Sequence, residues 1–226
     1  PNSSNAVAVI KSEIIIVDGN FQVAQLKLPS LNQGGLKDVT LINSNEGTLT
    51  ITGQGVNQPV QMNRNGQNLI FNLPVIFDSN ENIKGNWRFN SGNQSMTFAK
   101  EYSLIINDDI ELTAVNTKSE IHFNGKILGE GNLIFGAKSD AFFGPFFNGY
   151  QFDGKMIIEG GNTSNDNVTL TANVLDDGTF LKEADGKIIV NESGSTIHIN
   201  GTNILKGNII ITSTHNLNLN INKNQS

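Results

Sequence analysis

The sequence predicts an all-β protein of many short antiparallel strands that close into a barrel near the C-terminus. The chain holds 34 Asn and 23 Gly among 226 residues, and both types favour turns over helix interiors. Apolar residues recur at every second position between these turns, which is typical of strands with one buried face. The last such segment, residues 216–222, alternates Asn with Leu or Ile without a break. We expect it to close the barrel against an earlier strand, because closure removes exposed edges.

Apolar alternation places the predicted strands in order along the chain. The first two, residues 14–17 and 21–28, flank the triplet Asp-Gly-Asn at 18–20, which predicts a hairpin turn. A segment at 69–77 is broken by Pro74, which favours an edge or a bulge because proline has no N–H for a ladder. The other predicted strands are residues 39–42, 48–51, 60–62, 83–89, 96–106, 110–115, 120–127, 132–135, 150–159, 168–175, 187–191, 196–200, 207–212 and 216–222.

One local pattern marks the corners of the second half. An apolar residue followed by Asn or Asp, Gly, and Lys or Thr occurs at 123–126, 152–155, 184–187 and 199–202. The separations are too irregular for a solenoid repeat, so we interpret the pattern as a set of hairpin corners.

Charge suggests a domain boundary. Residues 1–105 carry seven basic and seven acidic side chains, whereas residues 106–226 carry eight and fourteen and hold the whole net charge of −6. Strand spacing becomes more regular at the same point. The sequence therefore predicts a flexible tether at 1–6, an N-terminal β domain at 7–105 and a C-terminal β-barrel at 106–226.

The stretch DAFFGPFFNGYQFDG, residues 140–154, contains six of the sixteen aromatic residues. We interpret it as a barrel corner. Gly144 and Pro145 would turn the chain, and Phe142 or Phe143 would plug one end of the barrel.

Composition excludes several function classes. The chain has no cysteine, so a disulfide, a thiolate metal site or a cysteine nucleophile cannot form within these residues. No Walker loop, dinucleotide fingerprint, nucleophile elbow or EF-hand loop is present. Only two arginines occur and lysines do not cluster, which argues against a nucleic-acid or anionic-membrane partner. We expect no enzymatic activity.

Candidate contact residues are aromatic. Trp87, Arg88 and Phe89 lie in one predicted strand and would anchor an interface if that face is exposed, although a core position is the simpler interpretation of Trp87. Phe146 and Phe147 form the other candidate pair.

The three histidines are weak candidates for a metal or heme ligand. His122 and His198 have the parity of the polar face of their strands, whereas His215 has the parity of the apolar face. No spacing typical of a metal site joins them.

Part of the chain resembles a known family. Phe123 and Gly125, then FFGP at 142–145, then Gly149, Phe152 and Gly154 resemble the barrel signature of transferrin-binding-protein-like surface lipoproteins of Gram-negative bacteria. The similar branch is exported by surface-lipoprotein assembly modulators and includes hemophilins and nematode-colonisation lipoproteins. The resemblance implies an N-terminal handle or effector domain followed by an eight-stranded antiparallel barrel.

The resemblance also implies a function. We expect a non-enzymatic binding module at the bacterial cell surface or secreted, used in host colonisation, with no cofactor. Its partners would be an outer-membrane translocator and a host protein or glycan, and its membrane contact would come only from a lipid anchor outside these residues. The alternative is a heme-binding protein for iron acquisition.

Overall fold

The computed structural model shows an all-β chain whose strands form four parallel sheets. It describes residues 3, 6–28, 38–54, 56, 59–62, 67–78, 85–90, 94–115, 118–129, 131–138, 141–148, 155–159, 167–173, 187–190, 195–200, 208–211 and 218–222. No helix long and apolar enough to cross a membrane occurs in these ranges.

The largest sheet has nine strands, and its neighbours follow chain order. Its members are β2 (Ile14–Asp18), β5 (Asp38–Ser44), β8 (Asn68–Asn72), β11 (Gln94–Phe98), β14 (Lys118–Phe123), β17 (Phe142–Asn148), β19 (Asn167–Asn173), β21 (Ser195–Asn200) and β23 (Asn218–Asn222).

Three smaller sheets complete the architecture. A five-stranded sheet contains β3 (Phe21–Val23), β6 (Leu49–Ile51), β9 (Val75–Phe77), β12 (Leu104–Ile106) and β15 (Ile127–Leu128). A three-stranded sheet contains β1 (Val7–Val9), β4 (Gln25–Leu28) and β7 (Val60–Met62). A six-stranded sheet contains β10 (Gly85–Asn90), β13 (Ile110–Val115), β16 (Leu133–Lys138), β18 (Lys155–Glu159), β20 (Lys187–Val190) and β22 (Asn208–Ile211).

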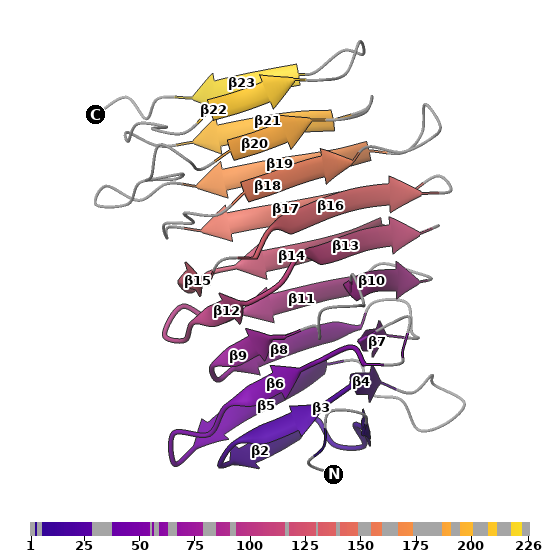
Figure 1. The fold of residues 1–226 in the computed structure, drawn as a ribbon, viewed down its shortest axis with the longest axis vertical. Helices are drawn as coiled ribbons and strands as arrows, with labels where there is room; N and C mark the ends of the chain where they lie inside the picture. Colours follow the sequence, from indigo (N-terminus) through magenta and orange to yellow (C-terminus); the bar gives the residue numbers. More distant parts are fainter. Residues whose placement is uncertain are drawn as a thin grey trace.

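The chain winds as a β-solenoid. It passes through one strand of each face in turn, as in β8, β9 and β10, and then repeats the path in β11, β12 and β13. In Figure 1 the coils stack from β2 near the bottom to β23 at the top, and two layers of arrows point in opposite directions. Each coil therefore buries its apolar side chains against the coils above and below it.

The predicted antiparallel eight-stranded barrel with a handle domain is wrong. Every strand pairing in the described ranges is parallel. Alternating apolar and polar residues show that one face of a strand is buried, but they do not identify the partner strand. The irregular spacing of the pattern at 123–126, 152–155, 184–187 and 199–202 therefore does not exclude a solenoid.

The hairpin predicted at residues 18–20 is also wrong. β2 and β3 on either side of it belong to different sheets, so the turn is a corner of a coil. Gly19 has a φ of 93°, a left-handed conformation that glycine adopts without strain. Pro74 likewise occupies a corner, between β8 and β9, and its carbonyl accepts a hydrogen bond from the Leu49 N–H at 3.1 Å. A corner residue needs no ladder N–H, which is why proline fits there.

The stretch around Gly144 and Pro145 does not turn the chain. β17 runs straight through both residues from Phe142 to Asn148, in the interior of the nine-stranded sheet. Its ladder to β19 pairs Phe143 with Val168 and Phe146 with Thr171. The two pairs are three positions apart in both strands, so the ladder keeps its register across Gly144 and Pro145. Likewise β23 closes no barrel, because it lies at one edge of the sheet beside β21.

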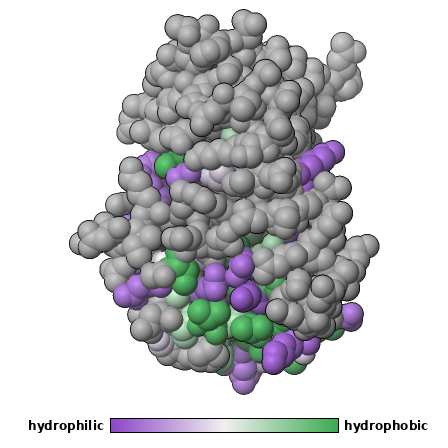
Figure 2. Space-filling view, turned by 90° about the vertical axis from the view of Figure 1, so that its right-hand side faces the viewer, coloured by the Kyte–Doolittle hydropathy of each residue, from purple (hydrophilic) through white to green (hydrophobic). Residues whose placement is uncertain are grey.

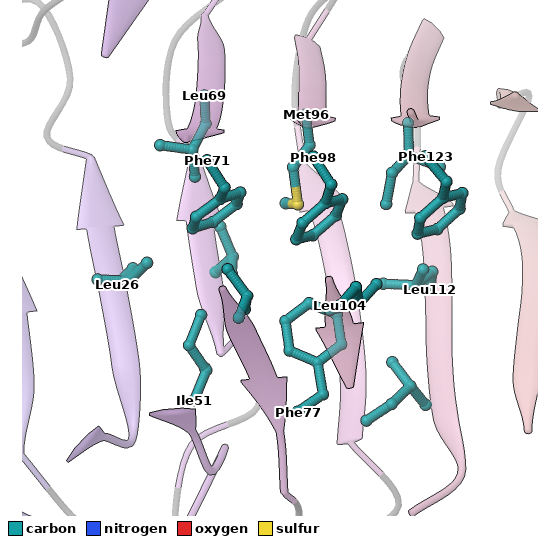
Figure 3. Packing of buried hydrophobic residues seen from close by; sticks show 14 of the residues in the cluster. Leu26, Ile51, Leu69, Phe71, Phe77, Met96, Phe98, Leu104, Leu112 and Phe123 are labelled. Carbon is teal, nitrogen blue, oxygen red and sulfur yellow. The ribbon is translucent and has the colours of Figure 1, made fainter. Parts of the chain in front are cut away.

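An aromatic row forms the centre of the core. Leu41, Phe71, Phe98, Phe123 and Phe147 share one register row across five strands. Figure 3 shows Phe71, Phe98 and Phe123 side by side in neighbouring strands. Ring centroids are 4.9 Å apart for Phe71 and Phe98, and 4.8 Å apart for Phe123 and Phe147. Stacked rings at equivalent positions bury large apolar surfaces and hold successive coils in register.

Polar side chains connect the coils outside the core, which gives the abundant asparagines a structural role. Asn45 Nδ2 donates to Asp18 Oδ1 at 2.9 Å, and Asn68 Nδ2 donates to Asp38 Oδ1 at 2.5 Å. Each bond joins side chains from successive coils. Short amide and carboxylate side chains can make such bonds without lengthening the turn.

The nine-stranded sheet continues across residue 106, since β11 pairs with β14. The domain boundary placed there from charge stays a prediction. In the segment predicted as a tether, the Ser3 N–H donates to the Gln22 carbonyl at 2.8 Å, and the Ala6 carbonyl accepts from the Ala24 N–H at 2.8 Å.

Candidate functional site

The candidate site lies on the outer face of the nine-stranded sheet, on the adjacent strands β14 and β17. In β14, Ile121 and Phe123 are buried, so the alternate residues Glu120 and His122 are directed away from the core. This confirms the parity expected for His122. In β17, Phe146 has the same outward parity, whereas Phe143 and Phe147 are buried.

The register brings His122 and Phe146 together. They are ladder partners, and their rings stack with centroids 4.7 Å apart and planes 6° apart. His122 Nε2 lies 3.3 Å from Glu120 Oε2, and the two side chains are 28% and 38% exposed. The site therefore combines an aromatic ring, an imidazole and a carboxylate within reach of solvent.

The interactions inside this cluster are weak enough to be exchanged for a partner. An exposed histidine–carboxylate pair contributes about 0–1 kcal/mol to stability. An aromatic pair contributes about 0.5–1.5 kcal/mol beyond the area that it buries. A ligand that bonds to the carboxylate or the imidazole would therefore replace only weak interactions between the side chains of the cluster.

The same register row extends on both sides of the cluster. Thr97 is the ladder partner of His122, and Thr171 is the ladder partner of Phe146. Thr171 in turn pairs with His198 on β21. His198 is thus three strands from His122, or about 14 Å at the usual strand spacing. The register therefore puts His122 and His198 on strands that are not neighbours.

The other candidate residues lie elsewhere. Phe147 is 2% exposed and belongs to the aromatic row of the core. Trp87, Arg88 and Phe89 lie in β10 and are ladder partners of Leu112, Thr113 and Ala114, but their side chains fall outside the described part of the structure. His215 also lies outside the described residues.

A separate apolar cavity opens at the N-terminal end of the solenoid. Its volume is about 140 Å³, and its lining includes Ile15, Val17, Phe21, Val23 and Leu26. No histidine lines it, and the described residues contain no group of three or more acidic or histidine side chains that could hold a metal ion. Among the described side chains, this apolar cavity and the His122 imidazole therefore lie at different places, whereas a heme site needs both together.

Sequence reasoning identified the parts of the outer cluster but not their contact. In the sequence alone His122 is an isolated histidine, and Phe146 belongs to an aromatic stretch. The available signal was the spacing of core phenylalanines, since Phe71, Phe98, Phe123 and Phe147 follow one another after 27, 25 and 24 residues. His122 and Phe146 are also 24 residues apart, which is one coil in this part of the chain.

Comparison of the chain with protein-family models, with curated proteins and with solved structures gives no match.

Proposed function

We propose that the protein is a non-enzymatic binding module, exposed at a bacterial surface or secreted, that contacts a host protein or glycan through the outer face of its nine-stranded sheet. The observation that carries the proposal is the Glu120–His122–Phe146 cluster, which lies in the middle of that face on β14 and β17.

The chemistry of the cluster fits recognition of a polar surface. Glu120 accepts hydrogen bonds, His122 can donate or accept, and the Phe146 ring supplies apolar area at a low cost in side-chain entropy. The ladder neighbours Thr97 and Thr171 belong to residue types that add hydroxyl groups. Sugars and polar protein loops present the matching hydroxyl, amide and C–H groups.

The same arrangement offers little for catalysis. The carboxylate and the imidazole bond to each other on an open face, whereas acid–base catalysis needs groups directed at a substrate in a site that excludes water. The neutral polar composition, with 16% charged residues, also fits a surface that binds through many hydrogen bonds.

The host-colonisation role and the translocator partner have a different basis. They rest on the resemblance in residues 123–154 to exported surface lipoproteins, whose barrel this chain does not have. We keep them as proposals that a comparison of host colonisation by the wild type and a precise deletion strain tests. Unimpaired colonisation by the deletion strain would reject the role.

Direct binding tests the site itself. The full chain is applied to arrays of host glycans and immobilised matrix proteins, beside the double variant Glu120→Ala/Phe146→Ala. We expect wild-type binding to at least one array component and a loss of at least tenfold in affinity for the variant. A matched control is Ile105→Ala, a half-buried residue of β12 in a different sheet, which should bind as the wild type does. Equal binding by the double variant would exclude this face, and no binding by the wild type would exclude the function.

A further inference from the structure

Exposed apolar side chains gather at the N-terminal end of the solenoid. The described residues include six large exposed hydrophobic residues, and all except Leu128 lie in β1, β2 and β3. The most exposed are Ile14 and Ile16 on β2, at 62% and 66%. In Figure 2, hydrophobic side chains of the described residues lie together near the lower end, where Figure 1 places the N-terminus.

β2 ends the nine-stranded sheet, and within the described ranges no strand pairs with its outer edge. In the neighbouring β3, by contrast, the Gln22 carbonyl accepts a hydrogen bond from the Ser3 N–H. The Thr40 N–H donates to the Glu13 carbonyl at 2.7 Å, so odd-numbered residues of β2 bond to β5. In a parallel ladder the alternate residues face the other side, so the backbone groups of Ile14 and Ile16 face outward from the sheet.

The sequence of β2 lacks the usual protection of an edge strand. Natural edges carry charges, prolines or bulges that block pairing with another chain. β23, at the opposite edge of the sheet, has polar Asn at alternate positions in Asn218–Asn222. β2 instead reads Ile-Ile-Ile-Val-Asp, with four apolar residues in succession and its only charge at the end.

The apolar cavity lies directly behind this edge. Ile15, Ile16 and Val17 of β2 contribute to its lining, together with Phe21 of β3 and Ala8 of β1. Within a solenoid such a space is filled by the next coil. An occupant of this end therefore needs a strand that bonds to the backbone of β2 and an apolar side chain that enters the cavity mouth.

We propose that a second copy of the chain covers this end, with the β2 strands of the two copies pairing antiparallel about a two-fold axis through Ile15. Outward backbone groups of Ile14 and Ile16 then bond to those of Ile16 and Ile14 in the other copy. Ile15 meets its own counterpart in a non-hydrogen-bonded pair, where side chains approach most closely.

Self-complementarity favours this arrangement over head-to-tail stacking. An antiparallel pair centred on Ile15 places isoleucines opposite isoleucines on the exposed face, and it joins two apolar cavities mouth to mouth. A head-to-tail stack would place Asn220 of β23 in the register row of Ile14. The two-fold arrangement also closes, whereas head-to-tail contacts continue into filaments.

Light scattering after size exclusion tests the assembly. We expect the wild type at twice the chain mass of 24.5 kDa, and the variant Ile14→Lys/Ile16→Lys at the chain mass itself. Both replaced side chains are mostly exposed, so the fold should tolerate lysine, which circular dichroism checks. Leu128→Lys is the matched control, because Leu128 is 49% exposed on β15 and should leave the dimer intact.

A cross-link tests the two-fold axis independently of any lysine variant. Because the chain has no cysteine, Ile15→Cys introduces the only thiol. Under mild oxidation we expect a covalent dimer, since the Cα separation of a non-hydrogen-bonded antiparallel pair suits a disulfide. Leu128→Cys should stay monomeric on a denaturing gel. A wild type that is monomeric throughout the micromolar range, or a dimer in which Ile15→Cys does not cross-link, would overturn the proposal.

Discussion

Phe98 and Phe123 stack with their ring centroids 5.6 Å apart and their planes 4° apart, although 25 residues separate them in the chain. The ladder between β11 and β14 pairs the two residues directly. Phe98 stacks on Phe71 from the preceding coil in the same way. It also makes a T-shaped contact with Phe77, with the ring centroids 5.7 Å apart. Phe98 thus joins three coils through one side chain.

Replacing Phe98 should reveal how much the aromatic row contributes. Phe98→Ala should lower the free energy of unfolding by about 3–5 kcal/mol, because it removes a buried ring and leaves a cavity between two stacked neighbours. Equilibrium urea unfolding measures the change. Phe98→Leu, which keeps part of the volume, should cost less. A loss below about 1 kcal/mol for Phe98→Ala would contradict the placement of this ring in the core.

β17 offers a test within a single strand. Phe143 is 0% exposed and lies 5.9 Å from Phe135 between ring centroids, so Phe143→Ala should destabilise the protein by about 3–5 kcal/mol. Phe146→Ala, three positions later but on the outer face, should cost about 1.5 kcal/mol or less, because it mainly loses the stack on His122. Thermal and urea unfolding of both variants give the comparison. Equal losses would mean that the two faces of β17 are not distinct.

Gly125 should not tolerate a side chain. A Cβ atom there would lie 2.0 Å from the carbonyl oxygen of Tyr102 and 2.6 Å from that of Ala99, both of which belong to the backbone of the preceding coil. Gly125→Ala should therefore force the corner apart and cost about 1–3 kcal/mol, measured as a lower urea midpoint.

Gly19 provides the control for that corner. A Cβ atom at Gly19 would meet nothing within 4 Å, and its φ of +93° is the only constraint. Gly19→Asn should cost less than Gly125→Ala, because asparagine tolerates positive φ better than other residues do. A corner at 125 that accepts alanine without loss would contradict the close stacking of these coils.

Heme binding has a direct optical test. Because His122 is outside the apolar cavity and its ring is stacked on Phe146, we expect no shifted Soret band at stoichiometric heme. The titration is repeated with His122→Ala and His198→Ala, which should behave as the wild type does. A shifted band in the wild type that either variant abolishes would establish heme binding and replace the binding-module proposal.

The positions of many strands and the inward parity of many residues could be predicted from the sequence. The sequence does not predict β1 or β17, and Gly144 and Pro145 favour a turn where β17 lies. Predicted strands at 39–42, 60–62 and 110–115 match β5, β7 and β13 within a few residues, and Ile121 and Phe123 are buried as their spacing indicated. The contact between His122 and Phe146 could not be predicted without the coil length. It depends on the register between two strands that are separated by a full turn of the solenoid.

The two-residue periodicity of a strand is local, so the sequence is enough to predict an all-β chain, many of its strands and their apolar faces. The pairing of strands is not local, and the fold shows that successive strands belong to different sheets and that each pairs in parallel with its counterpart one coil away. A turn such as residues 18–20 serves a hairpin and a solenoid corner equally well at the level of residue type. The choice depends on where the chain buries its apolar face, and here stacked rows such as Phe71, Phe98, Phe123 and Phe147 bury it between coils.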